Sequence, residues 1–213
     1  MISALTLASL LLVAPLDSRV ICVDPGSTVP DATLRELYEE GQSYPDFLDA
    51  AVRRAELWHG NTDKADAIDP ALIERARAIE GTWRFLAVAI DSCSDSVSTI
   101  PYLGRLVALV DGLDMRIVDP TVGRSIMEGH RTPDGRASTP TVLLLDDEYD
   151  EVGCFIERPP QLQTWILENN ETLSSNEIYE QKMEWYADDA GDKTVEAFVL
   201  MLEAAATGAT ICG

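Results

Sequence analysis

The chain has 213 residues, enough to bury a substantial core within one domain that carries helical additions. Its 16 Lys and Arg stand against 37 Asp and Glu, which gives a formal net charge of −21. Because such a surface repels nucleic-acid phosphates and anionic membranes, neither is an expected partner.

Residues 1–30 combine an apolar stretch over residues 1–16 with a turn-rich linker. The stretch has no Lys or Arg ahead of its apolar run and no clear small-residue cleavage site, and it is short for a membrane span. We therefore expect a cytoplasmic protein, with export through residues 1–16 as the alternative. Export would place the cysteines in an oxidising compartment.

Residues 31–80 are expected to form an N-terminal helical extension. Apolar spacing predicts helices over 33–40 and 44–58 and a third helix that begins at Asp69-Pro70. Ser43 is typical of the N-cap of the second helix. We expect His59 to lie as a capping charge at the C-terminal end of that helix.

Residues 81–170 alternate between short apolar runs and helical periodicity, as in an α/β core. The predicted strands are 83–90, 115–118, 141–145 and 151–156, and the predicted helices are 95–110, 120–128 and one that begins at Pro160. The crossover between the first two strands should be right-handed.

Residues 171–213 are expected to form a C-terminal helical extension and tail. The periodicity predicts helices over 176–187 and 193–206, followed by a loose tail that holds Cys212 as an exposed thiol.

The four cysteines (Cys22, Cys93, Cys154 and Cys212) lack metal-ligand spacing, so we expect no metal site and no cofactor. Disulfides are allowed in three connectivities. A chain of this size does not need them to fold, so most of the cysteines are predicted to be free.

Cys93 lies where a buried strand gives way to a helix, in the segment Asp91-Ser92-Cys93-Ser94-Asp95-Ser96. The unpaired N–H groups and the dipole of a helix N-terminus favour an anion and so the thiolate. Asp91 and Asp95 oppose the thiolate if they are ionised and close. The alternative is that Cys93 is simply a small buried hydrophobe.

A second element, Ser138-Thr139-Pro140, leads directly into the strand that begins at Thr141. A Cys-x-x-Ser segment that opens a helix, a proline eight residues after the cysteine and a Thr-Pro before a later strand together resemble the thioredoxin fold. The closer resemblance is to bacterial thioredoxin-like proteins with an Asp-Trp-Cys-Gly-Asp segment, which Asp91, Cys93 and Asp95 match.

Two further motifs carry the same resemblance, which extends from about Leu34 to about Ala206. Asp134-Gly135 and Pro140 match the Asn-Gly-x-x-x-x-Pro of these proteins, and Arg158-Pro159 matches their Arg-Pro. The resemblance implies a thioredoxin-like βαβαββα core, here with extra N-terminal and C-terminal helices.

The resemblance also implies which residues lie near Cys93 in the folded chain. Pro140 is expected to be cis, with the Thr139 backbone beside the sulfur as a place for an extended peptide; the alternative is a trans proline that merely begins a strand. His130 either reaches the site as a base or faces solvent from its loop. Arg158 is expected to meet the acidic segment of Asp91 and Asp95.

Several positions depart from the resembled family. Ser96 stands where a dithiol oxidoreductase has its second cysteine, so no Cys-x-x-Cys disulfide can form. Ser92 and Ser94 replace a tryptophan and a glycine, and Ala87 replaces a buried acid. The Ser96 hydroxyl either donates to the Cys93 thiolate or caps the helix.

Two functions follow as hypotheses. In the first, Cys93 carries out monothiol thiol–disulfide exchange with a protein or a low-molecular-weight thiol or disulfide, a possible enzymatic activity. In the second, the chain is a redox-inactive binding module that uses the groove beside Thr139 and Pro140. Neither hypothesis indicates an oligomeric state.

Overall fold

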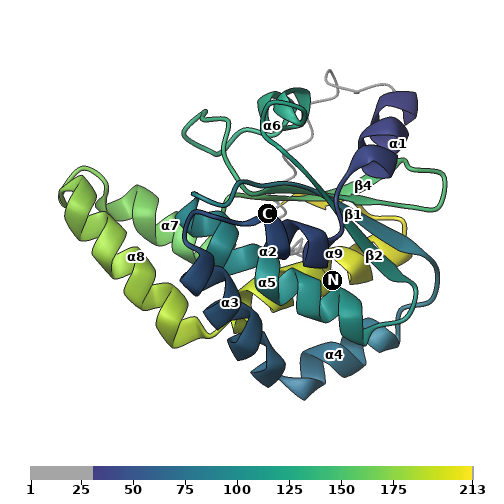
Figure 1. The fold of residues 1–213 in the computed structure, drawn as a ribbon, viewed down its shortest axis with the longest axis horizontal. Helices are drawn as coiled ribbons and strands as arrows, with labels where there is room; N and C mark the ends of the chain where they lie inside the picture. The colour runs from purple at the N-terminus through teal and green to yellow at the C-terminus, as the bar shows by residue number, and fades with distance from the viewer. Residues whose placement is uncertain (1–30, 213) are drawn as a thin grey trace, which may run out of the picture.

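The computed structural model describes residues 31–212, so the apolar segment 1–16 lies outside the described residues. In this part of the chain a five-stranded sheet has the order β2-β1-β3-β4-β5 (Figure 1). β1 runs parallel to β2, and β3 is antiparallel to both β1 and β4. The strands are β1 (Trp83–Val88), β2 (Leu113–Val118), β3 (Thr141–Leu145), β4 (Glu151–Ile156) and β5 (Ile211–Cys212).

The helices lie between the strands and at both ends of the described chain. They are α1 (Asp31–Glu40), α2 (Tyr44–Ala50), α3 (Ala55–Lys64), α4 (Pro70–Arg77), α5 (Ser94–Leu109), α6 (Arg124–Gly129), α7 (Pro160–Asn169), α8 (Ser175–Asp189) and α9 (Asp192–Ala206). The predicted α/β class and the βαβαββα order of the core are confirmed.

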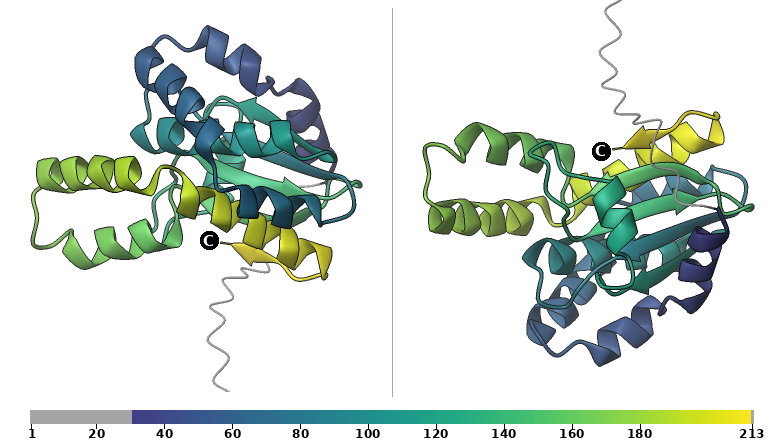
Figure 2. Two further views of the ribbon diagram at one scale, coloured as in Figure 1. Left: turned by 90° about the horizontal axis from the view of Figure 1, so that it is seen from below. Right: turned by 90° about the horizontal axis from the view of Figure 1, so that it is seen from above.

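The sheet is buried on both faces. Phe85 and Ala87 of β1 point into the cluster under α5 and α9, whereas Leu86 and Val88 point into the cluster under α1 and α6 (Figures 1 and 2). Burial on both faces explains why β1 is continuously apolar over its last four residues rather than alternating.

The α7–α8 hairpin projects from one side of the sheet (Figure 2). Leu162 and Ile166 of α7 pack with Tyr186 of α8 in a small third cluster. α8 begins with a capping box, in which Ser174 and Glu177 each accept from the other's backbone N–H. This hairpin carries residues that reach the segment around Cys93.

The single helix predicted over 44–58 is two helices, α2 and α3. Between them, backbone N–H groups bond to the carboxylate of a residue distant in sequence instead of to helix carbonyl groups. The N–H groups of Val52 and Arg53 donate to Asp91 Oδ2 at 3.0 and 2.7 Å, and Arg54 adopts the left-handed conformation at φ 56°. His59 lies exposed within α3, so the prediction that it caps a helix end is wrong.

The predictions of a loose tail and of free thiols at Cys154 and Cys212 are also wrong. β5 adds to the sheet in parallel beside β4, with Cys212 opposite Cys154 in the register. The two cysteines form a disulfide. Strand pairing brings them together although 58 positions separate them in sequence.

Among the described helices, none is both long and apolar enough to cross a membrane.

Phe198 of α9 should contribute strongly to stability, because its fully buried ring lies 5.7 Å from that of Phe85 and 4.8 Å from that of Phe155. We expect Phe198→Ala to lower the free energy of unfolding by about 3–5 kcal/mol, measured by urea denaturation. Leu200 on the same helix is 45% exposed. Leu200→Ala is the matched control and should change stability by no more than about 0.5 kcal/mol. Equal losses in the two variants would contradict this packing.

Candidate functional site around Cys93

Cys93 connects β1 to α5 and is the N-cap residue of that helix. The Ser96 N–H donates to the sulfur at an N···S distance of 3.5 Å, and the thiol donates to the Thr139 carbonyl oxygen at 3.1 Å. The Thr139–Pro140 peptide bond is cis. Cys93 is a free and partly exposed cysteine, and its sulfur lies at a helix N-terminus.

Ser96 contacts the sulfur through its backbone rather than its side chain. The residue is completely buried, and its hydroxyl has no hydrogen-bond partner within residues 31–212. The predicted bond from this hydroxyl to the sulfur is therefore absent. The alternative that Ser96 caps the helix is wrong as well, because Cys93 occupies the N-cap position.

Asp95 is a buried carboxylate that side chains from three other positions surround. Lys182 Nζ lies 2.6 Å from Asp95 Oδ2 and also donates to Ser94 Oγ at 2.9 Å. The Tyr186 hydroxyl donates to Asp95 Oδ1 at 3.0 Å, and Arg158 Nε lies 3.4 Å from the same oxygen. Asp95 is 4% exposed and Lys182 is 7% exposed, so this network excludes water.

The charges of the network offset the repulsion that Asp95 would exert on a Cys93 thiolate. Lys182 and Arg158 supply positive charge directly at the Asp95 carboxylate. Burial, together with the negative charge of Asp95, raises the pKa of Tyr186 well above its usual range. Tyr186 therefore stays a hydrogen-bond donor to Asp95.

The two residues that precede Cys93 are held by α3 and by the residue just before that helix. The Trp58 indole N–H donates to the Asp91 carbonyl oxygen at 3.0 Å, and Arg54 Nε donates to the Ser92 carbonyl oxygen at 2.7 Å. Arg54 Nη1 also donates to the Tyr179 hydroxyl of α8 at 3.1 Å. The loop that presents Cys93 is thus fixed from both the N-terminal and the C-terminal helices.

Comparison with known proteins agrees with this geometry. A thioredoxin family model matches residues 41–183, which include Cys93, Pro140 and Lys182. The chain belongs to this thioredoxin family.

Two solved structures share the fold of this thioredoxin-family chain. A protein of unknown function from Pseudomonas aeruginosa is 20% identical at a TM-score of 0.64, over 80% of this chain and 97% of that one. An HIV epitope scaffold is 19% identical at a TM-score of 0.61, over 79% of this chain and 95% of that one. No curated protein matches the chain in sequence.

The structure places His130 away from Cys93. Its Nε2 lies 2.8 Å from Glu151 Oε1 and its Nδ1 lies 2.8 Å from the Ile126 carbonyl oxygen. Glu151 pairs with Leu145, at the end of β3 opposite to Thr139. Burial lowers the pKa of His130, but the bonds to Glu151 and Ile126 outweigh it and raise that pKa overall. His130 therefore neither serves Cys93 as a base nor faces solvent.

Lys182, Tyr186 and Arg54 were not predicted as site residues in this thioredoxin-family chain. Lys182 and Tyr186 are four residues apart on α8, so they lie on one face of the helix. A lysine on the apolar face of a predicted helix signals a buried acid partner. That signal was available in the sequence, whereas nothing local indicated that Arg54 would reach Ser92.

The Lys182–Asp95 pair should be essential to stability, because removing one partner leaves the other charge buried. We expect Lys182→Met to lower the free energy of unfolding by about 3–5 kcal/mol in urea denaturation. The double variant Asp95→Asn with Lys182→Met should recover part of this loss, since it removes both charges. Lys193→Met at an exposed position of α9 is the control and should unfold like the unmodified chain. An unchanged midpoint for Lys182→Met would contradict the pairing.

Proposed function

We propose that this thioredoxin-family chain carries out monothiol thiol–disulfide exchange through Cys93. The observation that supports it best is the setting of Cys93, a partly exposed residue whose sulfur accepts a hydrogen bond from the Ser96 N–H at the start of α5. N–H groups at a helix N-terminus stabilise a thiolate, and the thiolate is the nucleophile in disulfide exchange.

The exchange takes two balanced steps. Cys93 gives its proton to solvent, and the thiolate attacks one sulfur of a disulfide; a bond from Cys93 to that sulfur forms, while the other sulfur leaves as a thiolate. An external thiolate then attacks this mixed disulfide and releases the Cys93 thiolate. The external thiol belongs to a low-molecular-weight compound or to a partner protein.

Ser96 determines that the second step needs an outside thiol. A dithiol oxidoreductase has a cysteine at this position to attack the mixed disulfide, whereas a serine hydroxyl cannot do so. The other cysteines within residues 31–212, Cys154 and Cys212, are bonded to each other. Once Cys22 is replaced by serine, the mixed disulfide on Cys93 should therefore be long-lived when no external thiol is present.

Thr139 and Pro140 are the proposed place for the substrate backbone. The Thr139 carbonyl oxygen lies 3.1 Å from the Cys93 sulfur, so a substrate chain that lies against the Thr139–Pro140 segment brings its own sulfur next to Cys93. A redox-inactive binding module would use the same Thr139–Pro140 segment without any exchange, and it is the competing function.

Glutathione disulfide tests the exchange in a Cys22→Ser background, in which Cys93 is the sole free thiol. We expect the protein to gain a single glutathionyl group at pH 7, measured by intact mass, and to keep it until a thiol is added. Cys93→Ser is the matched negative control and should gain none. An inert native protein whose Cys93 reacts only after denaturation would favour the binding module.

Ser96→Cys tests the role assigned to position 96 in the same assay. The introduced thiol lies one helical turn from Cys93 and should attack the mixed disulfide, so the glutathionyl group should be replaced by an intramolecular disulfide. An equally persistent glutathionyl adduct in this variant would show that position 96 cannot reach the sulfur.

A further inference from the structure

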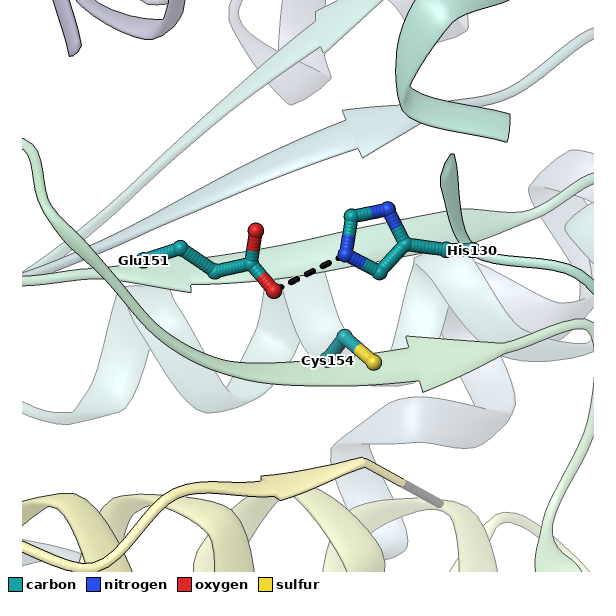
Figure 3. A group of neighbouring side chains, drawn as sticks. All are labelled: His130, Glu151 and Cys154. Carbon is teal, nitrogen blue, oxygen red and sulfur yellow. Dashed lines mark hydrogen bonds and ion pairs between the residues drawn. The ribbon is translucent and has the colours of Figure 1, made fainter. Parts of the chain in front are cut away.

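Three side chains with metal-ligating atoms meet on the face of the sheet that α6 covers (Figure 3). His130 follows α6, Glu151 begins β4 and Cys154 lies further along β4. One ligand atom from each of the three lies within 4.8 Å of the others. The disulfide adds a fourth candidate, because Cys212 Sγ is bonded to Cys154 Sγ.

The orientation of His130 fits a metal ligand. Its Nδ1 is held at 2.8 Å by the Ile126 carbonyl oxygen, which is the kind of second contact that fixes a ligating imidazole. This contact leaves Nε2 facing Glu151 Oε1 at 2.8 Å (Figure 3).

The disulfide determines how many ligands are available. A thiolate binds Zn²⁺, whereas a sulfur within a disulfide does not supply one. While Cys154 and Cys212 are bonded, the cluster offers one imidazole nitrogen and one carboxylate. A dithiol that reduces this bond is oxidised to its own disulfide and leaves two thiols on the protein, which give up two protons when they bind a metal.

We propose that the reduced chain binds Zn²⁺ through His130, Glu151, Cys154 and Cys212. A small-molecule disulfide that oxidises the two cysteines back to their bond is itself reduced to two thiols, and the Zn²⁺ is released. Cysteine sulfur, histidine nitrogen and carboxylate oxygen all bind Zn²⁺, and these four residues supply the number of ligands that a tetrahedral site needs. Cys212 lies in the two-residue strand β5, which pairs with β4 and places it beside Cys154. This proposal is independent of the reaction assigned to Cys93.

Co²⁺ is the probe, because it reports both thiolate ligands and tetrahedral geometry by absorption. The full chain with Cys22→Ser and Cys93→Ser is reduced with a phosphine, freed of reductant without oxygen and titrated with Co²⁺. We expect thiolate-to-cobalt charge-transfer bands and tetrahedral d–d bands that saturate at one ion per chain, and loss of these bands when Zn²⁺ is added. The oxidised protein should show neither band.

Matched variants separate this site from general cation binding by an acidic chain. His130→Gln and Glu151→Gln should each weaken Co²⁺ binding at least about tenfold, whereas Asp147→Asn in the neighbouring acidic loop should not change it. Unfolding of each oxidised variant shows whether it keeps the fold. Equal binding by oxidised and reduced protein, or no charge-transfer bands after reduction, would overturn the proposal.

Discussion

The ion pair between the Asp95 carboxylate and the Lys182 ammonium, 2.6 Å apart, connects the first turn of α5 to the C-terminal helical hairpin. Removing two charges from water costs several kcal/mol for each ion, and close pairing with further hydrogen bonds is what offsets that cost. Tyr186 and Arg158 complete the surroundings of Asp95. The residues that follow Cys93 therefore depend on α8 for their conformation.

The residues that precede Cys93 depend in the same way on the N-terminal helices. Asp91 accepts two backbone N–H bonds from the break between α2 and α3, and Arg54 and Trp58 donate to the carbonyl groups of the loop. The sulfur is thus positioned by two extensions that flank the core in sequence. For this reason the extensions form part of the site, and residues outside the minimal βαβαββα core determine how Cys93 is presented.

The sequence predicted what local patterns determine and missed what distant contacts determine. β3 and β4 were predicted residue for residue, since a short apolar run between turns carries its own signal. The break after Ala50 was missed because its cause, Asp91, lies about 40 positions away. The pairing of Cys154 with Cys212 was missed because four cysteines allow three connectivities and the spacing selects none.

The two sulfur centres lie on different sides of the sheet. Cys93 begins α5, which packs on the face that holds Phe85, whereas Cys154 points into the opposite cluster with Leu86 and Leu143. A thiolate must approach a disulfide directly in order to attack it. The Cys93 sulfur contacts Thr139, ahead of β3, whereas Cys154 pairs with Leu143 within β3 and is bonded to Cys212. The exchange proposed for Cys93 and the reduction proposed for the Cys154–Cys212 bond therefore concern different parts of the fold.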